Sequence, residues 1–156
     1  MAIDMSGLLD ARCVGLELEQ KKKPELIAEL VELLNRGGRT TDPIRLSTEI
    51  MEREKLSSTG IGNGIAIPHV LSSTVSGTSL AFGRKLDGAR FDAVDNQPVS
   101  LFFLLVGPQG SHAEHLRILS KLARYLHDRT FCQALLDAAD PEAVIAAFRR
   151  KEESGG

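Results

Sequence analysis

The segment from Ser57 to His69 constrains the fold of this chain more than any other stretch of its sequence. It contains glycines at positions 60, 62 and 64, then the apolar run Ile65-Ala66-Ile67, and then Pro68 and His69. Glycine reaches backbone conformations that other residues avoid, and proline cannot donate a hydrogen bond to a neighbouring strand. The pattern predicts a loop, a short buried strand and a histidine presented where that strand ends. An ordinary turn before an ordinary strand-end histidine is the alternative.

The glycine loop differs from two well-known nucleotide-binding loops. The phosphate loop of nucleotide-binding proteins has Gly-Lys-Ser/Thr after its variable residues, and no such sequence follows the last glycine here. It leads into a predicted strand, whereas the dinucleotide-binding fingerprint leads into a helix. Backbone N–H groups of such a loop can still surround an anion. We therefore expect Gly62, Asn63 and Gly64 to help bind a phosphate group.

Composition places the chain among single-domain globular proteins. It has 156 residues, of which 42% are hydrophobic and 26% charged, and this length suits one domain with a real core. The formal net charge is -2, and the basic run 21–23 is short. With no tryptophan and a single tyrosine, base-stacking platforms are also scarce. We expect no nucleic-acid partner.

The sequence carries no membrane or secretory signal. No stretch of about 18 apolar residues occurs, and no apolar stretch follows positive charges near residue 1. The two cysteines, Cys13 and Cys132, lie far apart and are expected to be reduced packing residues. We expect a cytoplasmic protein without membrane insertion.

Periodicity along the chain predicts alternating strands and helices. The predicted strands cover residues 13–19, 65–67, 78–86 and 99–106, and the predicted helices cover residues 24–36, 43–54, 111–128, 130–138 and 141–150. Asp42 is the predicted N-cap of the second helix, and Ile44 and Ile50 lie on its predicted apolar stripe. Interleaved strands and helices indicate an α/β layer fold. The domain is expected to span residues 6–150, with residues 151–156 forming a disordered tail.

Several chemically active side chains are expected at one edge of this sheet. His69 follows a strand, and His115 lies in the first turn of the predicted helix 111–128, on its apolar stripe. Ligands commonly bind at strand ends in α/β sheets, so the two histidines are expected to face each other there. Arg53, one of the charges just before the glycine loop, can supply a cation, and the helix beginning near Ser111 can supply free N–H groups.

This set of groups favours phosphoryl transfer. A neutral imidazole is a competent nucleophile when one ring nitrogen is free and the other is held. Phosphoryl transfer otherwise needs in-line placement and positive charge or N–H groups around the oxygens. Less specific interpretations remain for each residue, because Arg53 can pair with Glu52 or Glu54 on the helix surface, and His115 can be a packing residue.

A metal site is the alternative chemistry. His69, His112 and His115 are all candidate zinc ligands. The spacing of His112 and His115 lacks the His-Glu-x-x-His pattern, and no cysteine or carboxylate is obviously placed to complete the ligand set. We therefore expect no metal and no other cofactor.

Three stretches of the sequence resemble one protein family. They are Glu52-Arg53-Glu54-Lys55 with the glycine loop through His69, then residues 91–99, and then residues 114–123. All three resemble the fructose/mannitol-type enzyme IIA domains of the bacterial phosphoenolpyruvate-dependent sugar phosphotransferase system, over about residues 6 to 150. Within that family the chain most resembles the stand-alone nitrogen-regulatory enzyme IIA. The resemblance implies a single-domain α/β sandwich in which helices flank both faces of a mixed β-sheet.

The resemblance also implies roles for particular residues. His69 matches the histidine that accepts a phosphoryl group from a phosphohistidine carrier protein, Arg53 the arginine that steadies this group, and His115 the second active-site histidine. Neither cysteine matches the acceptor of the sugar-specific B domains. Val70 stands where the family often has glycine, and its branched Cβ narrows backbone freedom beside His69.

The resemblance leaves two functions to compare. The chain is expected to be a phosphotransferase that either relays its phosphoryl group or signals by its phosphorylation state, with an enzyme IIB domain, a sensor kinase or a transporter as a further partner. The alternative is a binding module that docks a kinase or transporter without cycling phosphate.

Overall fold

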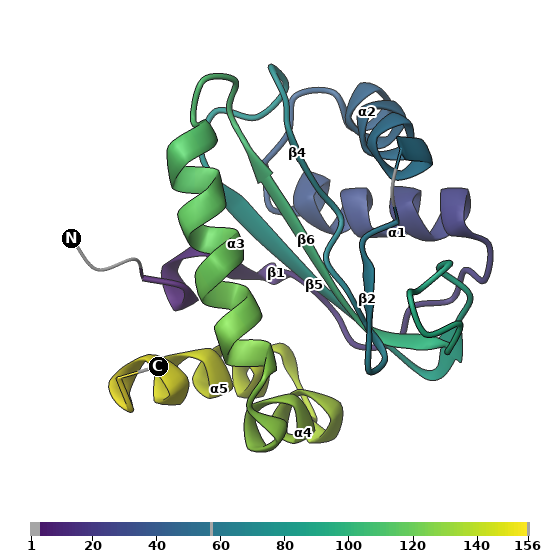
Figure 1. Cartoon of the computed structure of the whole chain (residues 1–156). Coiled ribbons are helices and arrows are strands. Elements are labelled where there is room, and N and C mark those ends of the chain that lie inside the picture. The colour runs from purple at the N-terminus through teal and green to yellow at the C-terminus, as the bar shows by residue number, and fades with distance from the viewer. Residues whose placement is uncertain (1–3, 57, 156) are drawn as a thin grey trace.

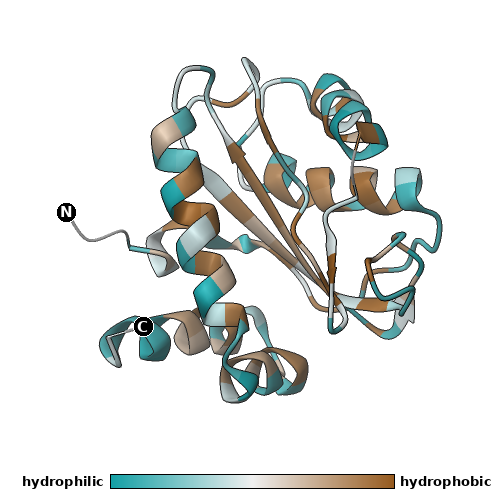
Figure 2. Ribbon diagram, viewed as in Figure 1, coloured by the Kyte–Doolittle hydropathy of each residue, from teal (hydrophilic) through white to brown (hydrophobic). Residues whose placement is uncertain are grey.

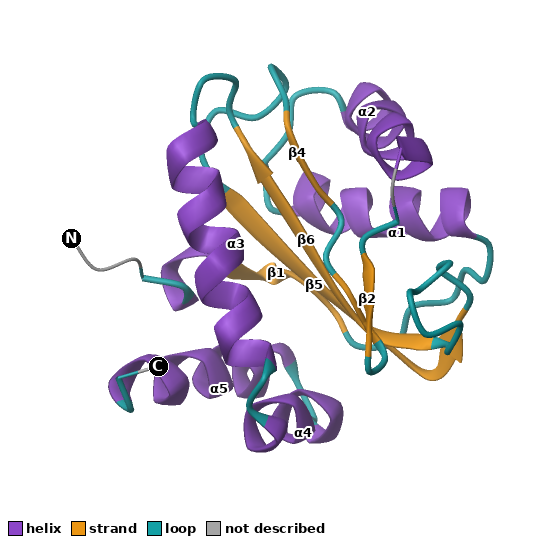
Figure 3. Ribbon diagram, viewed as in Figure 1, coloured by secondary structure: helices purple, strands orange, loops and turns teal. Residues whose placement is uncertain are grey.

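A mixed six-stranded β-sheet forms the centre of the protein. The computed structural model describes residues 4–56 and 58–155. The sheet order is β1-β5-β6-β3-β2, and β4 also pairs with β6. The strands are β1 (Leu9–Gly15), β2 (Gly60–Gly62), β3 (Ile65–Ala66), β4 (His69–Leu71), β5 (Ser79–Ala89) and β6 (Val99–Gly107). The β5/β6 and β2/β3 pairs are antiparallel and the other pairs are parallel. Figure 3 shows β6 and β5 as the two long strands of this sheet.

Helices cover both faces of the sheet. On one face lie α1 (Lys23–Arg36) and α2 (Pro43–Leu56), and on the other lie α3 (His112–Leu126), α4 (Arg129–Asp137) and α5 (Pro141–Glu153) (Figure 1). A short 3-10 turn, η1 (Ser6–Leu8), precedes β1. Asp42 accepts a hydrogen bond from the Arg45 N–H, as expected of the α2 N-cap. The predicted α/β fold with helices on both faces is confirmed. Across residues 4–56 and 58–155, no helix is both long enough and apolar enough to span a membrane.

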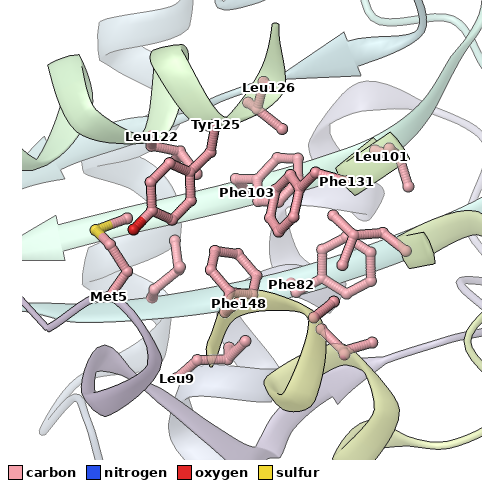
Figure 4. Packing of buried hydrophobic residues seen from close by; sticks show 14 of the residues in the cluster. Met5, Leu9, Phe82, Leu101, Phe103, Leu122, Tyr125, Leu126, Phe131 and Phe148 are labelled. Carbon is pink, nitrogen blue, oxygen red and sulfur yellow. The ribbon is translucent and has the colours of Figure 1, made fainter. Parts of the chain in front are cut away.

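Strand β6 divides the core into two hydrophobic clusters. Its alternate side chains Leu101, Phe103 and Leu105 belong to the cluster under α3, α4 and α5. Between them, Phe102, Leu104 and Val106 belong to the cluster under α1 and α2. Apolar residues therefore run continuously along this strand (Figure 2), as a strand covered on both faces requires. Figure 4 shows the first cluster, in which the rings of Tyr125, Phe131 and Phe148 pack together over Phe103.

Arg84 fastens α4 to the sheet. Its side chain lies in β5, is 8% exposed, and donates through Nη1 to the carbonyl oxygens of Leu135, Leu136 and Ala138 at 2.7–3.1 Å. These carbonyls lie at the end of α4, where no further helical N–H can reach them. The guanidinium therefore satisfies the end of a helix that is packed against the core.

The first strand begins earlier than predicted and is an edge strand. The expected strand at residues 13–19 is β1 at Leu9–Gly15, because apolar Leu9 enters the core next to Leu80 of β5. On its outer side, Arg36 at the end of α1 donates to the carbonyl oxygens of Arg12 and Val14. The N–H of Arg12 donates to the Asp10 carboxylate at 2.8 Å. Side chains thus form hydrogen bonds with backbone groups on the open side of this strand.

The second helix buries Ile50, as predicted, but not Ile44. Ile44, expected on the apolar face, is 80% exposed, and the buried residues are Leu46, Ile50 and Glu54. These three are four residues apart and share one face of the helix. Ile44 lies in the first turn, off that face.

The C-terminal helix extends into the predicted tail. Residues 151–153 are the last turn of α5 and not part of a disordered segment. The Lys151 ammonium contacts the Asp128 carboxylate at 2.8 Å, and Glu152 Oε1 accepts the Ser6 N–H. These two contacts hold the last turn against α4 and against the N-terminal 3-10 turn.

Candidate functional site

His69 lies within the sheet, beside its central strand. Strands β3 and β4 both pair in parallel with β6, and Pro68 interrupts the ladder between them. The carbonyl of Pro68 accepts the N–H of Leu105 at 3.0 Å, and His69 is the first residue of β4, level with Leu105. The sequence correctly places His69 directly after a short strand, but the strand resumes there. The ring is half-buried and is held by a rigid backbone.

His115 packs directly against His69. It lies in the first turn of α3, is 5% exposed, and its Nε2 lies 3.3 Å from Nδ1 of His69. The ring centroids are 5.3 Å apart and the planes are tilted by 53°. The predicted meeting of these two histidines is therefore present. Because Nδ1 of His69 faces His115, Nε2 is the ring nitrogen left for an incoming group.

Two contacts fix the beginning of α3 next to this pair. Thr78 Oγ1 donates to the Glu114 carboxylate at 2.9 Å, and Ser111 Oγ donates to the Pro108 carbonyl at 2.7 Å. Ser111 makes no side-chain cap to the helix. The first N–H groups of a helix have no intrahelical partner, so the positive end of the α3 dipole is located one turn from His115.

Both histidines are held in their neutral form. Burial, the neighbouring His115 and the positive charge of Arg53 together lower the pKa of His69 to about 4. Burial, followed by the charge of His112, lowers the pKa of His115 as well. At neutral pH the His69 ring therefore carries an unprotonated nitrogen, as a nucleophile requires.

Two arrangements of protons satisfy the contact between the rings. If His69 donates from Nδ1 to Nε2 of His115, the lone pair of His69 is on Nε2, the accessible nitrogen. If His115 donates from Nε2 instead, the His69 proton is on Nε2 and the ring cannot attack from there. Only the first arrangement supports chemistry at Nε2. In it His115 carries its proton on Nδ1, a buried atom with no hydrogen-bond partner among the described residues.

Arg53 supplies an uncommitted positive charge. It lies in the last turn of α2, is half-buried, and its charge contributes to the lowered pKa of His69. Among residues 4–56 and 58–155 its guanidinium has no hydrogen bond or ion pair. The alternative pairing with Glu52 or Glu54 is therefore absent there. A half-buried guanidinium beside a nucleophile is suited to bind phosphoryl oxygens.

A buried ion pair holds the segment that leads to His69. Both carboxylate oxygens of Glu54, which is 5% exposed, accept the N–H of Thr59 at 3.2 Å. The ammonium of Lys23, at the start of α1, contacts the same carboxylate at 3.0 Å. The carbonyl of Thr59 in turn accepts the N–H of Ile67 at 3.0 Å, two residues before His69. We call this arrangement of Lys23, Glu54 and Thr59 the loop clamp.

The sequence analysis did not identify the loop clamp, although a signal for Glu54 was present. The spacing Leu46, Ile50, Glu54 continues the buried face of α2 by one turn and ends on an acid. A charged residue at a core position needs a partner. The identity of that partner, Lys23, depends on how α1 and α2 pack and cannot be obtained from local spacing.

The glycine turn does not lie beside His69. Gly62, Asn63 and Gly64 have φ values of 95°, 57° and 78° and form the hairpin turn between antiparallel β2 and β3. The N–H groups of Ser100 and Leu101, at the start of β6, bind the carbonyl of Gly64. His69 is four residues further along β6, about 13 Å away along the strand. The part that this turn plays in binding the phosphate therefore stays a prediction, and at this separation along β6 it is not supported by contact with His69.

A shared metal site on the histidines finds no geometric support. His112 is exposed at the start of α3, whereas His115 is buried one turn later. Over the described ranges 4–56 and 58–155, no group of three or more His, Cys, Asp or Glu side chains is placed to hold a metal ion.

Comparisons with known proteins show a family match along nearly the whole chain. Residues 7–151 match the family described as "Phosphoenolpyruvate-dependent sugar phosphotransferase system, EIIA 2". The fructose-specific EIIABC component of Bacillus subtilis is 37% identical over 96% of this chain, but the chain spans only 24% of that protein's length. A nitrogen regulatory protein of Klebsiella oxytoca is 35% identical, over 92% of this chain and 88% of that protein.

A solved structure agrees with this match. Nitrogen regulatory protein IIA-Ntr from Neisseria meningitidis superimposes with a TM-score of 0.85 and 34% sequence identity, covering 92% of this chain and 98% of that one. Relatives named for fructose and relatives named for nitrogen regulation are thus similar to the chain at comparable identities.

Proposed function

Because the chain belongs to the EIIA 2 family of the phosphoenolpyruvate-dependent sugar phosphotransferase system, we propose that its His69 accepts a phosphoryl group from a phosphohistidine carrier protein. The single observation that carries this proposal is the contact between Nε2 of His115 and Nδ1 of His69 at 3.3 Å. It engages one ring nitrogen of His69 and leaves the other free.

The transfer is a displacement at phosphorus. Nε2 of His69 forms the new N–P bond, the N–P bond of the donor breaks, and the donor imidazole leaves with the electron pair. His69 retains its proton on Nδ1, directed at His115, so the ring nitrogen needs no separate base. Arg53 balances the negative charge of the phosphoryl oxygens, and the N–H groups at the start of α3 add partial positive charge.

The onward step requires a group outside this chain. Cys13 is 1% exposed, and burial raises the pKa of its thiol. Cys132 is half-buried, burial raises its pKa too, and its Sγ contacts the Leu126 carbonyl at 3.4 Å. Neither thiol is a ready acceptor. The phosphoryl group is thus passed to an acceptor beyond these 156 residues, such as an enzyme IIB domain, or is itself the signal that a sensor kinase or transporter reads.

Phosphorylation with purified components tests this function. The protein is incubated with phosphoenolpyruvate, enzyme I and the carrier protein, and acid-labile, base-stable label is counted. We expect labelling of the wild type and of His127→Gln, and none of His69→Gln. Label that persists in His69→Gln would place the acceptor elsewhere. A wild type that takes up no label yet retains a partner in a pull-down would favour the non-cycling binding module instead.

A further inference from the structure

A polar pocket lies across the sheet from the histidine pair. It has a volume of about 320 Å³ and is lined by Arg12 of β1, by Gly37, Gly38 and Arg39 after α1, and by Ser76, Gly77 and Ser79 at the start of β5. Ser79 is level with Val106 and His69 with Leu105, so the pocket and the histidines flank the same end of β6 from opposite sides. The proposed phosphoryl transfer uses none of these pocket residues.

Positive charge converges on this pocket. The guanidinium of Arg39 is half-buried, and among residues 4–56 and 58–155 it has no hydrogen bond or ion pair. Arg12 pairs with Asp10 at 2.9 Å. Hydrogen bonds from Arg12, aided by the charge of Arg39, lower the pKa of Asp10 to about 2. Two arginine side chains thus lie near a single carboxylate, that of Asp10, and a net positive charge remains.

The thiol of Cys13 supports this picture of the charge. It lies beneath Gly37, where an added Cβ would meet Sγ at 2.5 Å. Burial and then the charge of Asp10 raise the pKa of this thiol, and the charges of Arg39, Arg12 and Arg36 lower it. Three guanidinium charges and one carboxylate charge therefore act on a point beneath Gly37, which lines the pocket.

The walls of the pocket are fixed by buried hydroxyl groups. Thr40 and Thr74, both under 10% exposed, join their Oγ1 atoms at 3.0 Å, and the N–H of Thr41 donates to the Thr74 carbonyl at 2.9 Å. Ser72, fully buried, contacts Thr74 Oγ1 at 2.9 Å. These bonds fasten the loop after α1 to the loop before β5.

The opening of the pocket is clear. A Cβ built on Gly38 or on Gly77 meets no atom within 4 Å. In the last turn of α1, the carbonyls of Leu33, Leu34 and Asn35 accept the N–H groups of Gly37, Arg39 and Gly38, so these three carbonyls do not face an anion as free acceptors. A volume near 300 Å³ is the lower end of the range for small-molecule sites.

We propose that this pocket binds a small anionic metabolite, with its phosphate or carboxylate group against Arg39 and Arg12. Guanidinium groups bind both kinds of oxyanion through paired hydrogen bonds. Ser76, which is exposed, lines the same space and can contact the remainder of the ligand, whereas the hydroxyl of buried Ser79 donates to the Gly77 carbonyl at 3.0 Å. The uncommitted Arg39 is the principal anchor, and Asp10 opposes binding because its negative charge competes for Arg12.

Titrations followed by amide NMR test this site. Inorganic phosphate, succinate and uncharged glucose are added separately to the unphosphorylated protein, with an Arg53→Gln background to remove binding near His69. We expect saturable shifts at the amides of Gly38 and Gly77 with phosphate or succinate, and none with glucose. The better of the two anions identifies the ligand group as phosphate or carboxylate.

Variants of Arg39 and Asp10 are expected to change the affinity for the anion in opposite directions. Arg39→Gln should weaken the better anion about tenfold or more, and Arg39→Lys should retain most of the affinity. Asp10→Asn should strengthen binding severalfold, which a loss of structure would not do. Arg45→Gln, an exposed arginine on α2, is the matched control. No saturable shift at Gly38 and Gly77 with either anion, or equal affinity in Arg39→Gln and Asp10→Asn, would overturn the proposal.

Discussion

The loop clamp predicts a large and specific response to single charge removal. Lys23→Met leaves the Glu54 side chain, 1% exposed, without its counter-ion. Glu54→Gln leaves the Lys23 side chain, 15% exposed, with only the more distant Asp92 carboxylate at 3.8 Å and the face of the Phe91 ring. Removing one partner of a buried pair costs about 3–5 kcal/mol. We place Lys23→Met in that range. Glu54→Gln should cost about 2–3 kcal/mol, because the amide oxygen can still accept the Thr59 N–H and because Lys23 retains some access to water.

The double variant separates a paired interaction from two independent losses. Glu54→Gln with Lys23→Met removes both charges together, so no uncompensated buried charge remains. We expect it to be at least about 1 kcal/mol more stable than the sum of the single effects predicts. Urea unfolding monitored by circular dichroism gives each free energy of unfolding.

Neighbouring residues provide matched controls for the same charge changes. Glu52→Gln alters an exposed side chain on α2, and Lys22→Met alters the exposed N-cap residue of α1; both should stay within about 0.5 kcal/mol of the wild type. In Glu54→Gln the Thr59 amide should also exchange its hydrogen faster, while amides in β6 keep their protection. Strictly additive effects, or single variants as stable as the controls, would refute the reasoning.

Further predictions concern the histidine pair, Arg53 and Arg84. Between pH 6.5 and about 4 the unfolded chain binds a proton at His69 that the folded chain does not. The free energy of unfolding should therefore decrease as the pH is lowered through this range. The upper limit of this loss of stability is about 3 kcal/mol, or about 1–2 kcal/mol once solvent screening of the half-buried ring is included. In urea unfolding from pH 7 to 4.5, the free energy of unfolding should decrease more steeply for the wild type than for His69→Gln. Equal slopes would contradict the lowered pKa of His69. Arg53→Gln should slow phosphoryl transfer about 10- to 100-fold in rapid-quench experiments, since it removes charge-assisted hydrogen bonds. Arg53→Lys should recover part of the rate. An unchanged rate in Arg53→Gln would exclude Arg53 from the site. Arg84→Met should destabilise the fold by about 2–4 kcal/mol in urea, because three carbonyls at the end of α4 lose their donor, whereas Arg90→Met, an exposed control, should not.

The sequence predicts the elements and the histidine pair better than it predicts their surroundings. The apolar run that became β6 and the stripe that holds His115 depend on local periodicity, which a single sequence displays. The position of Gly62 to Gly64 depends on whether the glycine loop closes a hairpin between β2 and β3. The length of the loop does not decide whether it forms such a hairpin. Arg39 and Lys23 acquire their environments from loops and helices that are distant in sequence. Such contacts follow from packing, which local patterns do not specify.

The covered margins of the sheet determine how another protein can approach this one. At one margin Arg36 and Asp10 occupy backbone groups of β1, and at the other the N–H of Val94 binds the carbonyl of Gly60 in β2. An extended peptide, or a second copy of the chain, therefore finds few main-chain donors and acceptors with which to add a strand at β1 or beside Gly60. High concentrations should not drive aggregation through these two edges, and partners that meet them must recognise side chains.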